Sequence, residues 1–442
     1  MSTKTKLAWI IALATLIKCL AAISVNLGND EVYYLTYAQH LQWNYFDHPP
    51  MVALLIRLST YNLQYTNEFF VRLAPIILSG INTFLIFEVV RKLKNEQAGF
   101  LAALLFTASP YCSIISGLFI MPDAPQIFFW IISLYFLISI VSQTTTRKQL
   151  NKELILFGIA AGLCTMCKVH GIFLWFGLIG YCLIYSPKLL LNRYLYFAAL
   201  ITLIIIAPIL IWNIQNHFIT YNFHSNRISM NRGVHLLSFM REVAGGILYN
   251  NPINYLLIIV ALIINNQKSY LDKKVKRLLL FTSLPLIITL LFTSLFRDTL
   301  PHWSGPAFLP LIIITACQLS STKQFRSGNS IYIKLVYIAN IIVVVSIILG
   351  VLMVNYFPGT IGKQEYNVRG NGDFTLDIYG WKQLKTQFKN IRQKNIVTNL
   401  SKTTFIVSDK WFPAAHIDNY IAQPLKLDFV ALGSVADIHT YA

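Results

Sequence analysis

Charged residues are scarce in this sequence. Only 12% of its 442 residues are Asp, Glu, Lys or Arg, whereas 55% are hydrophobic. A typical soluble domain carries about 25% charge. Acidic residues are the rarer charged type, with 18 Asp and Glu against 36 Lys and Arg. This composition excludes an ordinary soluble protein and indicates a polytopic membrane protein.

The formal net charge of +18 would suit a nucleic-acid partner if the cations formed one patch. Most of them instead fall in short segments between apolar runs, where Lys and Arg mark the cytoplasmic side of a membrane. We therefore predict no nucleic-acid partner.

Cysteine is sparse as well. All six cysteines lie in apolar stretches, which is typical of hydrophobic packing rather than of a disulfide framework. Cys164 and Cys167 form a single C-x-x-C with no second pair, so a zinc or redox site is not favoured.

Long apolar runs are what the chain has in abundance. A bilayer span takes roughly 20 residues, and about eleven windows qualify. They lie near residues 7–27, 69–90, 98–120, 124–142, 153–169, 171–186, 194–214, 252–265, 277–296, 303–319 and 331–354. Lys and Arg gather in alternate connections, which predicts a cytoplasmic N-terminus and an outward set of loops and tail. We predict an all-α polytopic membrane domain over residues 1–355, with its first outward loop over 28–68.

The tail, residues 356–442, is the only soluble region of any size. Residues 403–407 have strand character, and residues 381–396 and 413–421 have helical spacing. We predict a small C-terminal α/β appendage outside the membrane.

The first outward loop opens with GNDEVYYLTYAQHLQWNYFDHPP, residues 28–50. A carboxylate such as Asp30 or Glu31, partly desolvated at a membrane surface, can act as a general base. The alternative is that Asn29 or Asp30 caps a helix and that Glu31 favours the positive end of this helix. Asp47 and His48 precede two prolines that fix an extended segment. They either shape a turn or offer two candidate ligands to a metal ion, too few to define a site.

Three further ionisable residues are expected on the outward side. Asp123, between two prolines in MPDAP, either caps a helix or joins Asp30 as a second rigid carboxylate. Lys168 and His170, in CKVHG, lie where the positive-inside rule asks for no cation. An outward Lys can hold an anionic phosphate. We therefore favour a functional role for Lys168.

Two later outward segments combine cations with aromatic and amide side chains. The loop 212–251 holds WNIQNHFITYNFHSNR with Arg227 and also Arg232, and RDTLPHW holds Arg297 and His302. Amides and aromatic faces suit a sugar, and arginines suit a phosphate. The same composition is equally normal in a loop at a membrane surface.

In this order, DEVYY, YFDHPP, MPDAP, CKVHG, WNIQNHF and LPHWSGPAFLP resemble motifs of the bacterial glycosyltransferase family 39 membrane enzymes. That family is part of the GT-C superfamily and is related to protein O-mannosyltransferases and lipid A aminoarabinose transferases. The resemblance covers about residues 7 to 355. It implies an inverting enzyme that transfers a sugar from a polyprenyl-phosphate carrier to an acceptor hydroxyl outside the membrane.

By this resemblance Asp30 would be the catalytic base, with Glu31 beside it, and Asp123 would orient the acceptor or the sugar. The implied substrate-binding residues are Tyr33, Tyr34, Asp47, His48, Lys168, His170, Arg227, Arg297 and His302. Aminoarabinose transferases typically carry Glu-Lys where this chain has Asp47 and His48. That departure leaves the substrate and the need for a divalent metal ion open.

The implied partners are a polyprenyl-phosphate-linked sugar, membrane lipid, and an acceptor glycan, lipid or protein. The implied location is the bacterial inner membrane, with the active site and C-terminus in the periplasm. A transporter or flippase of lipid-linked glycans is the alternative, but it would need ionisable residues along its spans, and here they gather at the outer ends. A non-catalytic scaffold that displays the tail is a third hypothesis.

Overall fold

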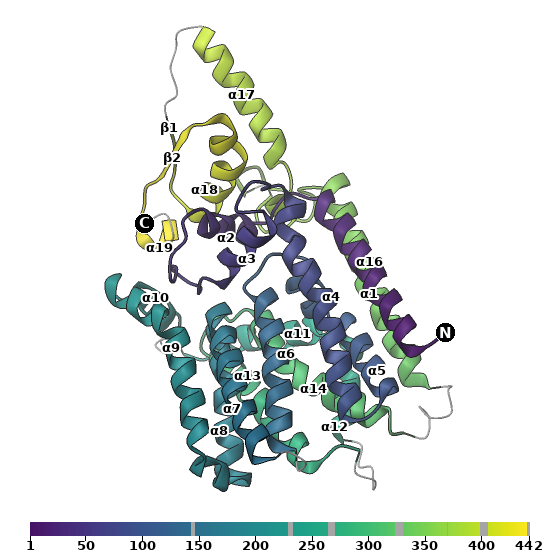
Figure 1. The fold of residues 1–442 in the computed structure, drawn as a ribbon. Coiled ribbons are helices and arrows are strands. Elements are labelled where there is room, and N and C mark those ends of the chain that lie inside the picture. Colours follow the sequence, from purple (N-terminus) through teal and green to yellow (C-terminus); the bar gives the residue numbers. More distant parts are fainter. Residues whose placement is uncertain are drawn as a thin grey trace. The chain divides into compact units, whose positions relative to one another are not determined.

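The computed structural model describes residues 1–142, 146–228, 233–263, 270–322, 330–368, 370–397 and 405–439. Helices make up nearly all of its regular structure (Figure 1). The first half holds α1 (Thr3–Ser24), α2 (Asn29–Gln39), α3 (Met51–Ser59), α4 (Glu68–Leu93), α5 (Glu96–Thr107), α6 (Asp123–Val141), α7 (Arg147–Cys167), α8 (Phe173–Tyr185) and α9 (Arg193–Gln215). The second half holds α10 (Ile219–Ile228), α11 (Leu236–Tyr249), α12 (Pro252–Ile263), α13 (Lys273–Ser294), α14 (Gly305–Leu319), α16 (Ile331–Tyr356), α17 (Trp381–Val397), α18 (Trp411–Ile417) and α19 (Val435–Ile438).

The prediction of an all-α polytopic membrane protein is confirmed, but the count of about eleven spans is not. Within the described residues, seven helices are long and apolar enough to cross a membrane, or eight if α11 and α12, bent by 94°, form one broken span. Several predicted spans are interrupted. α5 ends at Thr107, before Pro110 and a π-helical turn, and α14 has only 15 residues after a 3-10 turn. Helices this short fall below the roughly 20 residues that a bilayer requires.

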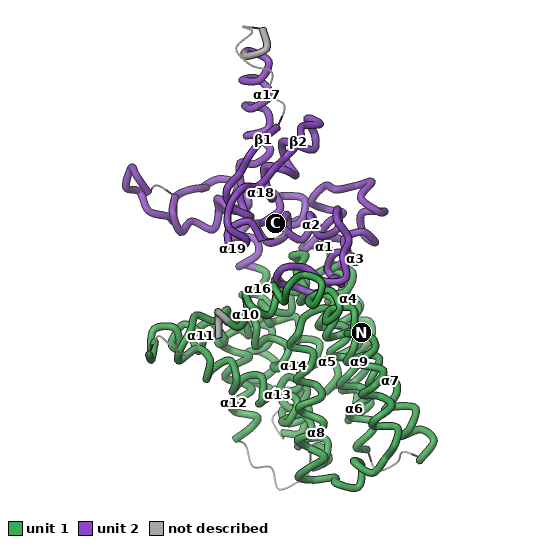
Figure 2. The backbone as a smooth tube through the Cα atoms, turned by 90° about the vertical axis from the view of Figure 1, so that its left-hand side faces the viewer, with its two compact units in different colours: residues 1–17, 75–344 green, residues 18–74, 345–442 purple. Residues whose placement is uncertain are grey.

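The chain divides into two compact units, and Figure 2 colours them separately. Unit 1 comprises Met1–Ile17 and Pro75–Val344, and unit 2 comprises Lys18–Ala74 and Val345–Ala442. Unit 2 therefore groups most of the predicted tail with the predicted first outward loop. The domain boundary at residue 355 stays a prediction.

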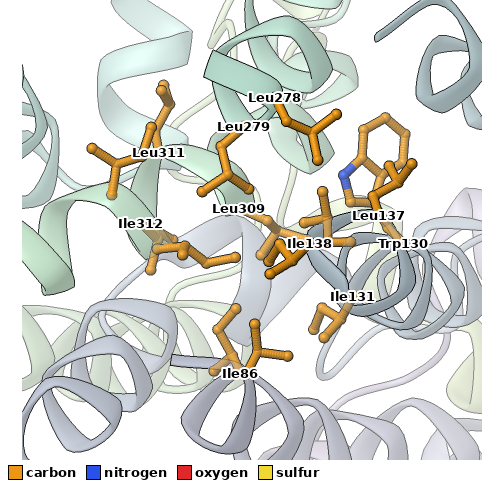
Figure 3. Packing of buried hydrophobic residues seen from close by; sticks show 14 of the residues in the cluster. Ile86, Trp130, Ile131, Leu137, Ile138, Leu278, Leu279, Leu309, Leu311 and Ile312 are labelled. Atoms are coloured by element: carbon orange, nitrogen blue, oxygen red, sulfur yellow. The ribbon is translucent and has the colours of Figure 1, made fainter. Parts of the chain in front are cut away.

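Unit 1 is organised around a large apolar core. Buried side chains from α4, α6, α13 and α14 converge there, among them Ile86, Trp130, Leu279 and Leu309 (Figure 3). Burial of such side chains is the main favourable term in folding. Asp123 is the first residue of α6, one of the helices that pack in this core.

Small residues allow α7 and α9 to pack closely within unit 1. Gly158 and Gly162 lie four residues apart on α7, and a Cβ at Gly158 would come within 2.4 Å of the carbonyl oxygen of Ala198 on α9. A small-xxx-small pattern of this kind lets membrane helices approach each other through van der Waals contact. Lys168 follows directly after this helix.

Unit 2 contains the only strands among the described residues. β1 (Phe405–Ser408) pairs in parallel with β2 (Asp428–Ala431). The predicted strand at 403–407 overlaps β1, with residues 403 and 404 outside the described residues. The predicted helices of the tail correspond to α17 and α18. In this unit α18 packs against α2.

Candidate active site

The candidate carboxylate of unit 1 is completely buried. Asp123 begins α6 with 0% of its surface exposed, and Lys168, directly after α7, is 3% exposed. Lys168 Nζ donates to both Asp123 oxygens, at 2.9 and 3.0 Å, and the Tyr111 hydroxyl donates to Oδ1 at 2.8 Å. We call Tyr111, Asp123 and Lys168 the Asp123 centre. A pair this desolvated depends on both partners, because either charge alone would be strongly destabilised there.

Two glycines make room for the Asp123 centre. A Cβ at Gly305 would come within 2.3 Å of the Tyr111 ring. At Gly171, a Cβ would come within 2.6 Å of a backbone nitrogen of α7. Only glycine leaves space at these positions. The first lets the ring reach the carboxylate, and the second permits the tight turn that follows Lys168.

Both predicted histidines of unit 1 are associated with one 3-10 turn, Pro301–Ser304. His302 in this turn is close enough to Asp123 to interact with it electrostatically. The ring of His170 lies 5.9 Å from that of Trp303 in the same turn. The structure thus brings His302 and Lys168 to one carboxylate, and it brings His170 to the turn that holds His302.

The predicted arginines lie in two other segments of unit 1. Arg297 is half-buried. Its neighbour Asp298 pairs with Arg241 at 3.1 Å, with 57% of the Arg241 side chain and 77% of the Asp298 side chain exposed. Arg227 belongs to α10, but its side chain and the whole of Arg232 lie outside the described residues.

In unit 2, Glu31 forms a second buried ion pair. Arg72 Nε donates to Oε1 at 2.8 Å and Nη2 donates to Oε2 at 2.5 Å. Arg72 is fully buried and also donates to three backbone carbonyls within residues 22–26. The Gly28 N–H donates to Oε2 at 2.9 Å. Both carboxylate oxygens are therefore engaged, so Glu31 fixes the start of α2.

Asp30, in contrast, is exposed in the first turn of α2. The residues just before it are held by the tail. The Leu27 N–H donates to the Tyr420 hydroxyl at 2.8 Å. His416 Nε2 lies 2.9 Å from Asn29 Oδ1. We call Tyr420 and His416 the tail clamp, because both restrain the turn that carries Asp30.

The imidazole of the tail clamp is kept neutral. His416 is 0% exposed, and its ring stacks on that of Trp381, with centroids 4.0 Å apart and planes 6° apart. Burial lowers the pKa of His416 to about 3, since a buried environment disfavours the charged form. A neutral ring donates through Nε2–H to the Asn29 amide oxygen.

Asp47 and His48 are surrounded by tyrosines of α2. Asp47 accepts hydrogen bonds from Tyr33, at 3.4 Å, and from Tyr37. The His48 ring lies 5.6 Å from that of Tyr34. Burial, followed by the charge of Asp47, raises the pKa of Tyr37, so this hydroxyl stays protonated and can donate.

Asp47 and His48 are the candidate metal ligands of the sequence analysis. Across the described parts of the chain, no group of three or more His, Cys, Asp or Glu side chains could hold a metal ion.

Four residues of these clusters were missed by the sequence analysis: Tyr111, Arg72, His416 and Tyr420. Arg72 carried a usable signal, since it is an ionisable residue inside a predicted span, and such residues mark sites by default. Tyr111 is one of 23 tyrosines, and His416 contacts a residue 387 positions away. Nothing in the local sequence distinguishes either of them.

The fold is shared with solved structures over nearly the whole length of the chain. ArnT from Cupriavidus metallidurans in the apo state matches with a TM-score of 0.66 and 14% identity, covering 99% of this chain and 87% of that one. The same protein bound to undecaprenyl phosphate matches with a TM-score of 0.65 and 15% identity, covering 98% and 87%.

A third structure agrees on the fold. The archaeal oligosaccharyltransferase AglB from Archaeoglobus fulgidus, in complex with an inhibitory peptide and a dolichol-phosphate, has a TM-score of 0.51 and 14% identity. The match covers 94% of this chain and 64% of that one.

Residues 47–212 match the family described as dolichyl-phosphate-mannose-protein mannosyltransferase. The matched segment contains the complete Asp123 centre. No curated protein matches the chain. The predicted resemblance to the GT-C superfamily is confirmed, and the assignment to family 39 stays a prediction.

Proposed function

We propose that this protein is a membrane glycosyltransferase that moves a sugar from a polyprenyl-phosphate carrier to an acceptor hydroxyl on a glycan, lipid or protein. The observation that carries the proposal is the fold. It is shared over 98% of the chain with an ArnT structure that holds undecaprenyl phosphate. A donor of this kind already lies in the membrane, which suits a polytopic enzyme.

In the proposed reaction Asp30 is the general base. The acceptor oxygen attacks the anomeric carbon of the sugar while the bond from that carbon to the phosphate oxygen breaks. Asp30 takes the hydroxyl proton, and the polyprenyl phosphate leaves, so the anomeric configuration inverts. The exposure of Asp30 in the first turn of α2 supports this role, because a base must reach its substrate within hydrogen-bond distance.

We assign different roles to the other two carboxylates. Glu31 positions the turn, since Arg72 occupies both of its oxygens. Asp123 holds Lys168, whose ammonium directs two donors at the carboxylate and has three in all. The remaining donor, the charge of Arg297 and the ring N–H groups of His170 and His302 are assigned to the departing phosphate.

The proposed location is the bacterial inner membrane, with a cytoplasmic N-terminus and chemistry on the periplasmic side. The alternation of Lys- and Arg-rich connections supports this orientation. Protease protection of tagged termini in intact spheroplasts would test it, since the C-terminus should be accessible and the N-terminus protected.

The experiment that tests the function is mass spectrometry of envelope lipids, glycans and glycoproteins from a deletion strain. The strain should accumulate a polyprenyl-phosphate-linked sugar and lack one modified acceptor. The gene for wild-type protein or for Asp428→Asn, an exposed aspartate in β2, should restore the product, whereas Asp30→Asn should not. An unchanged profile in the deletion strain would refute the proposal.

A further inference from the structure

Helix α17 is the most basic element of the tail. Its 17 residues, WKQLKTQFKNIRQKNIV, include five cations and neither Asp nor Glu. The predicted side of the tail is outward, where the positive-inside rule asks for no Lys or Arg. Membrane topology therefore does not explain this charge.

Four of the cations form what we call the basic stripe: Lys382, Lys385, Lys389 and Arg392. Their spacing of three, four and three residues places them within about 80° of the helix circumference and along about 15 Å of its axis. Lys382 and Lys389 are exposed, and Lys385 and Arg392 are half-buried. Like charges three and four residues apart reduce helix stability. The arrangement therefore has a cost in the stability of α17.

Little in the described structure offsets this cost. Among the described residues, the one ion pair of the basic stripe joins Lys382 to Glu68, at 2.8 Å. The other three members have no ion pair there. Within the described residues, three of the four cations of the stripe thus have no acidic partner at ion-pair distance.

The lower end of the basic stripe lies at the ends of two candidate membrane helices. Lys382 lines a cavity of about 320 Å³ together with Ser24, the last residue of α1, and Asn355, near the end of α16. Within unit 2, α17 extends beyond these helix ends (Figures 1 and 2). A flat lipid surface could therefore contact only the first turn of α17, whereas a chain rising from the membrane could follow the whole stripe.

We propose that the basic stripe binds a polyanionic glycan chain bearing phosphate or carboxylate groups, as the docking part of the acceptor. The role as an acceptor site rests on the proposed glycosyltransferase function; the binding itself does not. Lys and Arg both bind such groups, Arg in bidentate fashion and Lys as a point charge. A row of Lys and Arg side chains favours a ligand that carries several negative charges along one side.

Binding of short-chain inorganic polyphosphate to the full-length, detergent-solubilised protein tests the proposal. The wild type should bind, and more weakly as salt concentration rises. Lys385→Glu, Lys389→Glu and Arg392→Glu combined should weaken binding about tenfold or more. The corresponding Gln triple variant, which avoids charge reversal within the helix, should show the same direction of change.

The matched control is Lys394→Glu, Lys410→Glu and Lys426→Glu, which changes the net charge equally at exposed lysines off the stripe. Its affinity should stay within about twofold of the wild type. An equal loss in the control, or no binding by the wild type, would overturn the proposal.

Hydrogen exchange of α17 in nanodiscs separates a lipid partner from a soluble one. Polyphosphate should protect α17 equally in neutral and anionic lipid. Protection by anionic lipid alone would overturn the proposal in favour of a membrane surface. Asp30→Asn should bind polyphosphate normally while losing transfer, so failure of the binding site and failure of the proposed function give different results.

Discussion

Asp123 in unit 1 and Asp30 in unit 2 are held in opposite ways. Asp123 is completely buried and bonded to Lys168 and Tyr111, whereas Asp30 is exposed in the first turn of α2. The Asp123 centre fixes the carboxylate itself. Around Asp30 the restraint falls on neighbouring residues, through Arg72 and the tail clamp. The first arrangement suits a constant charge and the second suits a group that must exchange a proton.

The largest effect is expected from breaking the Asp123 centre. Lys168→Met leaves the buried carboxylate without its ammonium partner, which should cost about 3–5 kcal/mol of unfolding free energy. Combining it with Asp123→Asn should recover most of the loss. Denaturant titration in detergent measures both.

The exposed pair Arg241 and Asp298 provides the contrast. Arg241→Ala should change the unfolding free energy by less than about 1 kcal/mol, as exposed pairs contribute little. If Lys168→Met were as mild as Arg241→Ala, the Asp123 centre would not be the desolvated pair described here.

Removal of Arg72 should come next. Arg72→Met leaves Glu31 without its partner and frees three carbonyls, so residues 22–31 should exchange amide hydrogens at least about tenfold faster. Glu31→Gln, which keeps the shape but removes the charge, should show a smaller effect. Unchanged exchange in Arg72→Met would contradict the positioning role of the pair.

A pH dependence should arise from the tail clamp. The pKa of His416 is lowered to about 3 in the folded protein, so between about pH 6.5 and 3 only the unfolded state takes up a proton at this residue. The contribution of the neutral His416 ring to the free energy of unfolding is fully present above pH 6.5. It should fall by up to about 1.4 kcal/mol per pH unit on acidification.

His416→Gln can still donate to Asn29 but does not titrate. The difference between the wild-type and variant pH profiles isolates the contribution of His416. Parallel profiles between pH 6.5 and 5 would show that burial does not hold the ring neutral.

The smallest effect is expected for Tyr420→Phe. It removes one hydroxyl that accepts from Leu27 and donates to Glu68, which should cost about 1–2 kcal/mol. Thermal unfolding measures it. Tyr366→Phe, at an almost fully exposed tyrosine, serves as the control and should be neutral.

The helical membrane class could be predicted from the sequence, because apolar runs long enough to span a bilayer are sufficient to indicate it. The sequence also identified Asp123 and Lys168 separately, since ionisable residues at span ends are conspicuous. The span count was not confirmed, because Pro110 interrupts the run 98–120, which looks continuous, and because α14 has only 15 residues. The clamp of His416 on Asn29 joins residues 387 positions apart, and no local pattern encodes such a contact.

The most direct test of the central claim is the transfer rate of Asp30→Asn in reconstituted vesicles. The donor is the lipid-linked sugar that accumulates in the deletion strain. Loss of a general base should lower the rate by about 100-fold or more, with a melting temperature equal to that of the wild type. A folded Asp30→Asn variant that transfers sugar at the wild-type rate would contradict the account.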